Sequence, residues 1–230
     1  MIEQSIQELI QYGIEKELIT SEDEIFLRNQ LMDLLQLSAW ETPALPEVLP
    51  TIDEILDKLV SYAAEKGIII DSNAARDLFD TRIMGLLTER PHTVNRSFFA
   101  AYHRSPEEAT DWYYQYSKDT NYVRAGRIAK DLRWTYDCEY GTLDVTINRS
   151  KPEKDPRDIA AAKNQPQTKY PACQLCIENT GFAGTLTHLH GRISGRFPFP
   201  FTAETGLSST PPMAIIMNTA SCSIRNMFPW

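Results

Sequence analysis

The sequence has few cysteines, no excess of basic residues and no long apolar run, and each shortage excludes a class of protein. Four cysteines in 230 residues are too few for a disulfide framework. Twenty-three Lys and Arg residues against 31 Asp and Glu residues give a net charge of −8, so the broad positive surface of a nucleic-acid-binding protein is missing. The longest apolar stretch falls well short of the roughly 18 residues that span a bilayer. We therefore expect no nucleic-acid partner and no membrane partner.

The beginning of the chain also lacks the features of a secretory signal. Glu3, Glu8, Glu15 and Glu17 lie where a signal peptide has a basic region and then an apolar one. A cytoplasmic location is expected. With 42% hydrophobic residues, the chain is long enough to bury a core as one large domain or two small ones.

Charge divides the chain into three parts. Residues 1–100 hold 18 acidic and 8 basic residues, residues 101–188 hold 12 of each, and residues 189–230 hold 1 and 3. Compositions this different predict three regions with different roles. We expect a helical leader over 1–100, a partial α+β domain over 101–188 and an irregular tail over 189–230.

The helical leader is predicted from spacing and from helix-start signals. Its apolar residues recur at helical spacing and leave acidic residues on the solvent face, beginning with Ile6, Leu9, Ile10 and Ile14. Two capping boxes predict new helices, Ser21 with Glu24 and Thr51 with Glu54. Gly67 is expected to end the helix after Thr51, and Asp71 or Ser72 to begin another. We interpret this layer as structural.

Further along the chain the pattern changes from helix to strand. Ser105 followed by Pro106 predicts the start of one more helix. Residues 134–136 and 142–148 then alternate as strands do, with residues 139–141 as the turn between two antiparallel strands. A hairpin on helices indicates an α+β fold.

Basic side chains gather on both sides of this hairpin. The stretch that leaves the second strand, NRSKPEKDPRD at 148–158, carries Arg149, Lys151, Lys154 and Arg157 among stiffening prolines. A second cluster precedes the hairpin, namely Arg124, Arg127, Lys130 and Arg133. A strand exit of this kind can direct cations toward a phosphate, and both clusters could face one cleft. The simpler interpretation is a solvated charged loop.

Cys173 and Cys176 form a C-x-x-C pair, a spacing that lets two thiolates reach one tetrahedral zinc ion. One pair supplies half of the ligands of a zinc site. His188 and His190 lie near enough in sequence to supply the other two. They are separated by one residue, however, whereas the histidines of zinc fingers are separated by about three to five. A redox dithiol and two incidental buried cysteines are the other interpretations.

Several unusual strings carry a family resemblance. YVRAGRIAKDLRW, YGTLDVTINRSKPEKDPRDIA and YPACQLCIENTGFAG, with DLFDTRIMGLLTERP before them, resemble in order and spacing the second sequence class of the UDP-glucose–hexose-1-phosphate uridylyltransferases, the galactose-1-phosphate uridylyltransferases. The resemblance covers residues 1 to about 188. It implies a histidine-triad-like α+β fold that is incomplete in this chain.

The resemblance also implies an activity. Members of the family exchange UMP between glucose 1-phosphate and galactose 1-phosphate, with UDP-glucose and UDP-galactose as the nucleotide sugars, through a covalent uridylyl-histidine. A neutral imidazole suits this role because it divides one transfer into two in-line steps. By analogy, Cys173 and Cys176 match a structural zinc pair, and the residues expected to bind substrate are Asn148, Arg149, Ser150, Lys151 and Lys154, with Arg124 and Arg127 of the second cluster.

The chain departs from the family after residue 188. The family nucleophile lies in a His-x-His-x-Gln motif, whereas His188-Leu189-His190 continues into Gly191-Arg192. We assign no catalytic residue. Codons can be chosen for MAIIMNTASCSIRNMFPW so that the same nucleotides, read from two positions later, encode GYYNEHCIVFNKEHVPM. This second peptide resembles a YYNEH-type strand of the family. A frameshift after His188 would explain the tail, and we expect the chain alone to be inactive.

Two other functions remain open. The basic stretch after Asn148 could hold a nucleotide or another phosphate ligand without chemistry. The second function is that of a zinc-stabilised domain whose helical layer binds a protein partner. The sequence also leaves open whether the chain forms a homo-oligomer.

Overall fold

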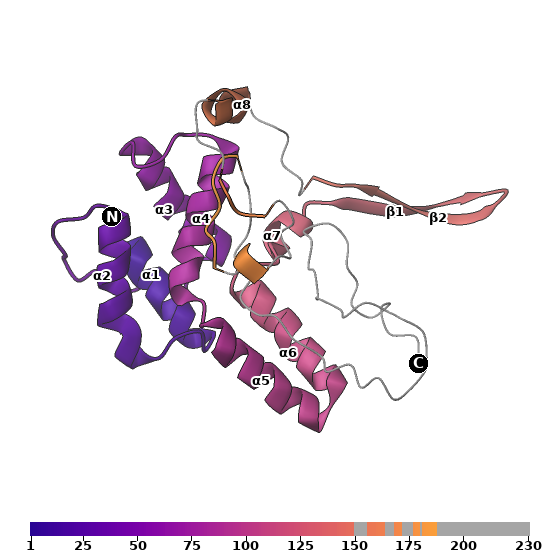
Figure 1. Ribbon diagram of the computed structural model, residues 1–230, viewed down its shortest axis with the longest axis horizontal. Helices are drawn as coiled ribbons and strands as arrows, with labels where there is room; N and C mark the ends of the chain where they lie inside the picture. Colours follow the sequence, from indigo (N-terminus) through magenta and orange to yellow (C-terminus); the bar gives the residue numbers. More distant parts are fainter. Residues whose placement is uncertain (150–155, 164–167, 172–176, 180, 188–230) are drawn as a thin grey trace.

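The computed structural model describes residues 1–149, 156–163, 168–171, 177–179 and 181–187, and most of these residues form helices (Figure 1). Six of them, which we call the helical body, are α1 (Ile2–Glu15), α2 (Glu24–Leu34), α3 (Ile52–Glu65), α4 (Asn73–Leu87), α5 (Pro91–Arg104) and α6 (Pro106–Asp119). The remaining elements are η1 (Ser21–Asp23), α7 (Ala125–Ile128), β1 (Leu132–Cys138), β2 (Gly141–Ile147), α8 (Pro156–Lys163) and η2 (Ile177–Asn179). The predicted combination of helices and one antiparallel hairpin, an incomplete α+β fold, is confirmed.

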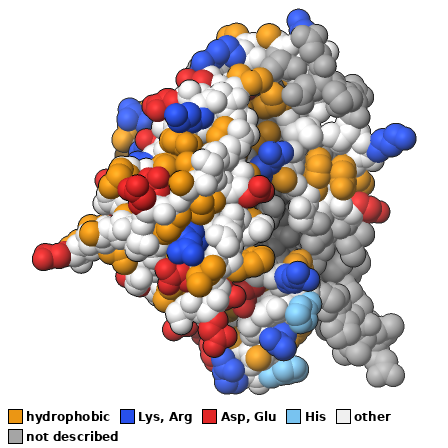
Figure 2. Space-filling model, turned by 90° about the vertical axis from the view of Figure 1, so that its left-hand side faces the viewer, with side chains coloured by type: hydrophobic (Ala, Val, Ile, Leu, Met, Phe, Trp, Pro, Cys, Tyr) orange, Lys and Arg blue, Asp and Glu red, His pale blue; other side chains and the backbone are white. Residues whose placement is uncertain are grey.

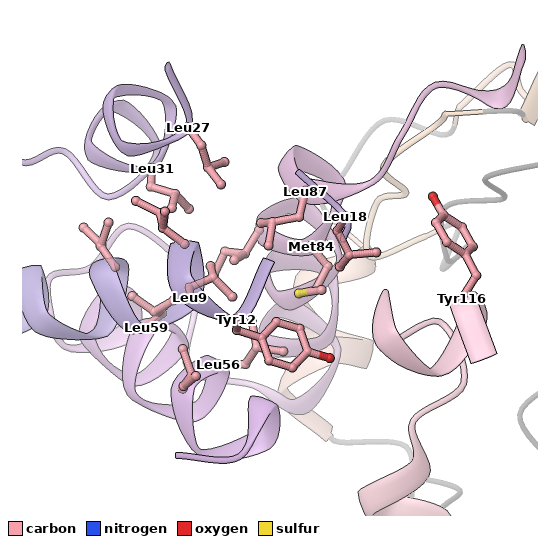
Figure 3. Packing of buried hydrophobic residues seen from close by; sticks show 14 of the residues in the cluster. Leu9, Tyr12, Leu18, Leu27, Leu31, Leu56, Leu59, Met84, Leu87 and Tyr116 are labelled. Atoms are coloured by element: carbon pink, nitrogen blue, oxygen red, sulfur yellow. The ribbon is translucent and has the colours of Figure 1, made fainter. Parts of the chain in front are cut away.

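The hydrophobic core lies inside the helical body, where α1 packs against α2 and α3, and α4 packs against α2 and α3 (Figure 3). Leu9 of α1, Leu59 of α3 and Leu87 of α4 are at most 1% exposed. Burying one such leucine contributes roughly 1.5–3 kcal/mol. The one-sided pattern that predicted the helical layer therefore corresponds to its buried face.

The two ends of the helical body are joined by a long-range contact. The Tyr12 hydroxyl of α1 donates a hydrogen bond to the main-chain oxygen of Asp119, at the end of α6, over 2.9 Å. Lys16 lies 4.0 Å from the carboxylate of the same residue. Burial raises the pKa of the Tyr12 phenol, so this group stays a donor. These contacts fix the end of α6 against α1.

Most of the predicted helix signals are confirmed. The Thr51 hydroxyl accepts from the Glu54 main-chain N–H over 3.3 Å while the Glu54 carboxylate accepts from Thr51. Gly67 follows α3 with φ +71°, the left-handed conformation that ends a helix. Of the two candidates for the next cap, Ser72 is the one that caps α4.

The predicted capping box of Ser21 with Glu24 is wrong. The box is formed one residue earlier, where the main-chain N–H and hydroxyl of Thr20 both donate to Asp23 over 2.9 Å. The reason is that a 3₁₀ turn, η1, precedes α2, so the helical segment starts before Glu24.

The hairpin is confirmed, with β1 antiparallel to β2 and Trp134 opposite Val145 in the register. It does not lie on the helices, however. Both faces of both strands are largely exposed, and Figure 1 shows the hairpin extending away from the helical body. Within the described residues the sheet has two strands. The three predicted region boundaries, 1–100, 101–188 and 189–230, stay predictions.

Candidate functional site

The segment between the helical body and the hairpin is held by a group of four charged residues, Asp77, Asp80, Arg124 and Arg127, which we call the Arg–Asp cluster. The Arg124 guanidinium donates to Asp80 over 2.7 Å and to Asp77 over 3.3 Å. Arg127, one turn further on, donates to Asp77 over 3.0 Å and through a second bond. Because both aspartates belong to α4, the cluster attaches α7 to the helical body.

Burial sets the electrostatics of this cluster. The side chains of Arg124 and Asp80 are 16% and 13% exposed, so the ion pair is largely removed from water. Burial raises the pKa of the Asp80 carboxyl above its ordinary range, although the Arg124 guanidinium opposes the shift. The Asn121 amide also donates to Asp80, over 3.4 Å. The hydrogen bond to Asp77 raises the pKa of Arg127, so this guanidinium stays charged.

The cluster bears on two of the residues predicted to bind substrate. The described partners of the Arg124 and Arg127 guanidinium groups are carboxylates of α4 and, for Arg124, the Asp77 main-chain oxygen, so the positive charges are balanced there. This arrangement gives both arginines a structural role. Their role in substrate binding stays a prediction.

The base of the hairpin brings its two ends together. The main-chain N–H of Arg149, two residues after β2, donates to the Asp131 carboxylate over 2.7 Å. Asp131 directly precedes β1. Asn148 and Arg149 are therefore held at the strand exit, as their place in the sequence predicted. Ser150, Lys151 and Lys154 lie outside the described residues.

The other end of the basic stretch is anchored as well. Pro156–Lys163 forms α8, and its Asp158 accepts hydrogen bonds from the Ser72 hydroxyl and from the Ala74 main-chain N–H, the latter over 3.2 Å. An acidic group suits the positive N-terminal end of α4. The interpretation of 148–158 as loop throughout is thus wrong from Pro156 onward, because a proline followed by a short alanine run begins a helix there.

Both described ends of the basic stretch are thus connected to α4. The hairpin end is tied through α7 and the Arg–Asp cluster, and α8 is tied through Asp158. The sequence did not reveal this arrangement, because the partners in α4 lie 44 to 84 residues from the groups they bind.

Cys173 and Cys176 also lie outside the described residues, as do His188 and His190. The segments that flank the cysteine pair do meet. The Tyr170 and Phe182 rings stack with centroids 3.9 Å apart, and the Asn179 amide donates to the Pro171 main-chain oxygen over 3.0 Å. The described residues contain no group of three or more His, Cys, Asp or Glu side chains that could hold a metal ion. Two thiolates at this spacing fit half of a zinc site by their donor chemistry.

The comparisons with known proteins identify the family. The family model described as galactose-1-phosphate uridyl transferase, N-terminal domain, matches residues 17–196. The chain belongs to this family. Galactose-1-phosphate uridylyltransferases with curated names are close in sequence: that of Fusobacterium nucleatum is 49% identical over 187 residues, that of Butyrivibrio fibrisolvens 45% over 189, and that of Bacillus subtilis 41% over 189. The family resemblance read from the motifs is confirmed.

The match to these uridylyltransferases covers most of this chain but less than half of each relative. It covers 80% of this chain and 36% of the Fusobacterium relative, and 82% of this chain and 49% of the Butyrivibrio relative. The chain thus spans about a third to a half of the length of the curated relatives it matches. No solved structure matches. Among the described residues, no helix is both long enough and apolar enough to cross a membrane.

The side of the helical body turned toward the viewer in Figure 2 carries charges of both signs. Acidic and basic side chains alternate with apolar ones across this face. Acidic and basic side chains are therefore intermixed on this face.

Proposed function

We propose that this chain is the N-terminal part of a cytoplasmic nucleotidyltransferase that exchanges UMP between UDP-hexoses and hexose 1-phosphates, with UDP-glucose, UDP-galactose, glucose 1-phosphate and galactose 1-phosphate as substrates. The match to the family's N-terminal domain over residues 17–196 carries the proposal. The position of Arg149 supports it, because this residue begins the basic stretch and its main-chain N–H is bonded to Asp131 at the exit of β2.

The basic stretch supplies what a nucleotide sugar requires. The diphosphate of a nucleotide sugar is negatively charged. The NRSKPEK segment that begins at Asn148 carries Arg149, Lys151 and Lys154. Hydrogen bonds from cations to phosphate are about twice as strong as neutral ones. We assign binding of the diphosphate to Arg149, Lys151 and Lys154, with Asn148 and Ser150 as uncharged donors.

The chemical step needs a nucleophile beyond these residues. In the reaction that we propose, an imidazole nitrogen attacks the α-phosphorus, the bond from this phosphorus to the bridging oxygen breaks, and the hexose 1-phosphate leaves. A second hexose 1-phosphate then takes the uridylyl group from the imidazole. The His188-Leu189-His190 sequence lacks the glutamine of the family motif, so we do not assign the nucleophile to it. The chain by itself is expected to bind UDP-glucose without turnover.

Calorimetric titration with UDP-glucose tests the binding assignment. The double variant Arg149→Ala/Lys151→Ala should bind at least tenfold more weakly, since two charge-assisted contacts are removed. The double variant Lys66→Ala/Arg104→Ala is the matched control, because it removes the same charge from exposed residues at the ends of α3 and α5 and should bind as the parent does. Equal weakening in both would mean that only net charge matters, and an unchanged affinity in the first would refute the site.

An exchange assay with UDP-glucose and galactose 1-phosphate tests the assignment of the nucleophile. Turnover by this chain alone would contradict it. In that event His188→Asn and His190→Asn variants would show whether one of these histidines is the nucleophile after all.

We propose a structural zinc ion for Cys173 and Cys176. Elemental analysis of the purified chain should find zinc, and a chelator should lower the melting temperature, because a structural site contributes folding free energy. Cys173→Ser should lose the metal. Cys138→Ser is the matched control, since the Cys138 thiol lies in β1 and donates to Gly141 over 3.2 Å. A chain that melts identically with and without chelator has no such site.

A further inference from the structure

The main chain of α7 comes very close to α3 at Gly126. A β-carbon added to this glycine would lie 1.7 Å from Oδ2 and 2.8 Å from Cγ of Asp53, the second residue of α3. Its three nearest atoms all belong to that one side chain. Glycine allows a close approach of the main chain that any other residue would prevent. The contact between α7 and the first turn of α3 therefore depends on Gly126.

This contact gives α7 a second attachment to the helical body. The first is the Arg–Asp cluster, in which Arg124 and Arg127 bond to aspartates of α4. Besides the hydrogen bond to Asp77, the charge of Asp53 raises the pKa of the Arg127 guanidinium, so Asp53 bears on both the main chain and a side chain of α7. One attachment would leave α7 able to turn about it. Contacts with two different helices fix its direction.

The turn after α7 carries this direction into the hairpin, and Figure 1 shows α7 between α4 and the base of β1. The main-chain N–H groups of residues 127–131 all donate to main-chain oxygens three or four positions earlier, over 2.9 to 3.0 Å. β1 begins at the next residue, Leu132. Because Asp131 accepts the hydrogen bond from the Arg149 main chain, the place of Arg149 follows from that of α7.

We propose that Gly126 is a positioning residue of the nucleotide-sugar site, because the close approach that it permits fixes the direction of the hairpin and the place of Arg149. Gly126 acts through α7 and Asp131, and it has no side chain with which to bind a ligand. The effect on binding rests on the proposed function. The effect on the hairpin does not, and it can be measured without a ligand.

A methyl group at position 126 should break the contact in either of two ways. α7 can move away from α3, or the exposed Asp53 side chain can turn away from α7. Both leave α7 attached to α4 but no longer to α3, so the hairpin gains freedom to swing. Removing the Asp53 carboxylate as well should restore the contact, because the atoms nearest to the added methyl group are then gone and the methyl group fills their place.

Residual dipolar couplings of the ligand-free full chain measure how the hairpin is directed relative to the helical body. In the parent, the couplings of amides in β1, β2 and α4 should fit one alignment tensor. In Gly126→Ala, the hairpin couplings should shrink and no longer fit the tensor of α4. In Gly126→Ala/Asp53→Ala, they should fit one tensor again.

Gly67→Ala is the matched control. It adds the same methyl group to a glycine at the end of α3, where nothing lies within 4 Å of the added carbon. The φ of +71° makes alanine unfavourable there, so this variant should lose stability without losing any contact of α7. Its hairpin couplings should therefore match those of the parent.

Calorimetric titration of the same four proteins with UDP-glucose tests the consequence for binding. Gly126→Ala should bind at least about fivefold more weakly, because Arg149 is no longer held in place before the ligand arrives. The double variant should regain the affinity of the parent, and Gly67→Ala should keep it.

The two measurements separate this inference from the proposed function. A parent that does not bind UDP-glucose contradicts the proposed function, while the couplings still decide whether Gly126 directs the hairpin. Couplings of Gly126→Ala that fit the tensor of the parent would overturn the inference, and so would a double variant that behaves like the single one. An unchanged affinity in Gly126→Ala, with a parent that binds, would also overturn it. Far-UV circular dichroism of each variant confirms that the helical body is retained.

Discussion

The helical body and the hairpin both follow the same rule of apolar residues on one side, yet only the helical body buries that side within the described residues. Leu59 of α3 is fully buried, whereas Leu143 of β2 is 50% exposed. The difference comes from geometry: six helices can enclose a common core, but a two-stranded sheet has nothing of its own to place over its apolar face. Patterning in a sequence therefore says that a face needs covering, and it does not say what covers it.

The largest expected effect contrasts the two regions directly. Leu59→Ala should lower the free energy of unfolding by about 3 kcal/mol, because it leaves a cavity in a core that cannot fully collapse. Leu143→Ala should lower it by less than about 1 kcal/mol. Urea titration followed by circular dichroism measures both. Comparable losses would mean that the hairpin is as well packed as the helical body, and the contrast would fail.

The Arg–Asp cluster at the junction of the two regions should give the next largest effect. Asp80→Ala removes the carboxylate bound to the largely buried Arg124, and we expect a loss of about 2 kcal/mol in unfolding free energy after allowance for partial exposure. Arg124→Ala should cost less in the Asp80→Ala background than in the parent, because only its bonds to Asp77 then remain to be lost, so a double-mutant cycle reports the coupling of Arg124 with Asp80. The exposed pair of Arg104 with Glu108 provides the control, since Arg104→Ala should leave stability unchanged within error. Additive losses at Asp80 and Arg124 would contradict the coupling.

The attachment of α8 to the helical body predicts a smaller effect. Ser72→Ala removes the cap of α4 and the hydroxyl that donates to Asp158, and should cost about 1–2 kcal/mol. Ser105→Ala removes a capping hydroxyl that accepts from the Glu108 main-chain N–H of the same helix, α6, and should cost about 1 kcal/mol or less. Chemical denaturation of both variants in an Asp158→Ala background decides whether the larger loss at Ser72 is due to its contact with α8. If Asp158→Ala leaves the difference intact, α8 contributes nothing.

The smallest expected effect is a change with pH at one helix start. Hydrogen bonds from the Thr51 main chain and hydroxyl hold the pKa of the Glu54 carboxyl below its ordinary value. A lowered folded-state pKa contributes stability above the unfolded pKa, near 4.5, and this contribution is lost as the pH falls through the folded value. Glu54→Gln should be less stable than the parent at neutral pH, and the gap should close at lower pH. Glu65→Gln, which removes an exposed carboxylate at the other end of α3, is the matched control in the same urea titrations, and a pH-dependent loss of the same size there would contradict the assignment to the capping box.

Local signals in the sequence predicted most of the helical body, because a capping box or a left-handed glycine acts within one turn. Thr51 with Glu54, and Gly67, are examples. Where two boxes overlap, as at Thr20 and Ser21, the sequence alone could not choose between them. The partners of Arg124 and Arg127 could not be read either, because they lie 44 to 50 residues away in the chain. Asn148 and Arg149 were placed correctly at a strand exit, whereas their anchoring by Asp131 depends on how the hairpin closes.

The hydrogen bond from Tyr12 to Asp119 has a consequence for biosynthesis. The two residues are separated by 107 positions, so α1 must wait for most of the helical body to be translated before its phenol finds an acceptor. At the usual pace of about 5–20 residues per second, this delay is roughly 5–20 s. During that interval α1 can form its contacts with α2 and α3 in the nascent polypeptide, but the end of α6 is still missing. The contacts of α1 with α2 and α3 can therefore form earlier in synthesis than the hydrogen bond of Tyr12.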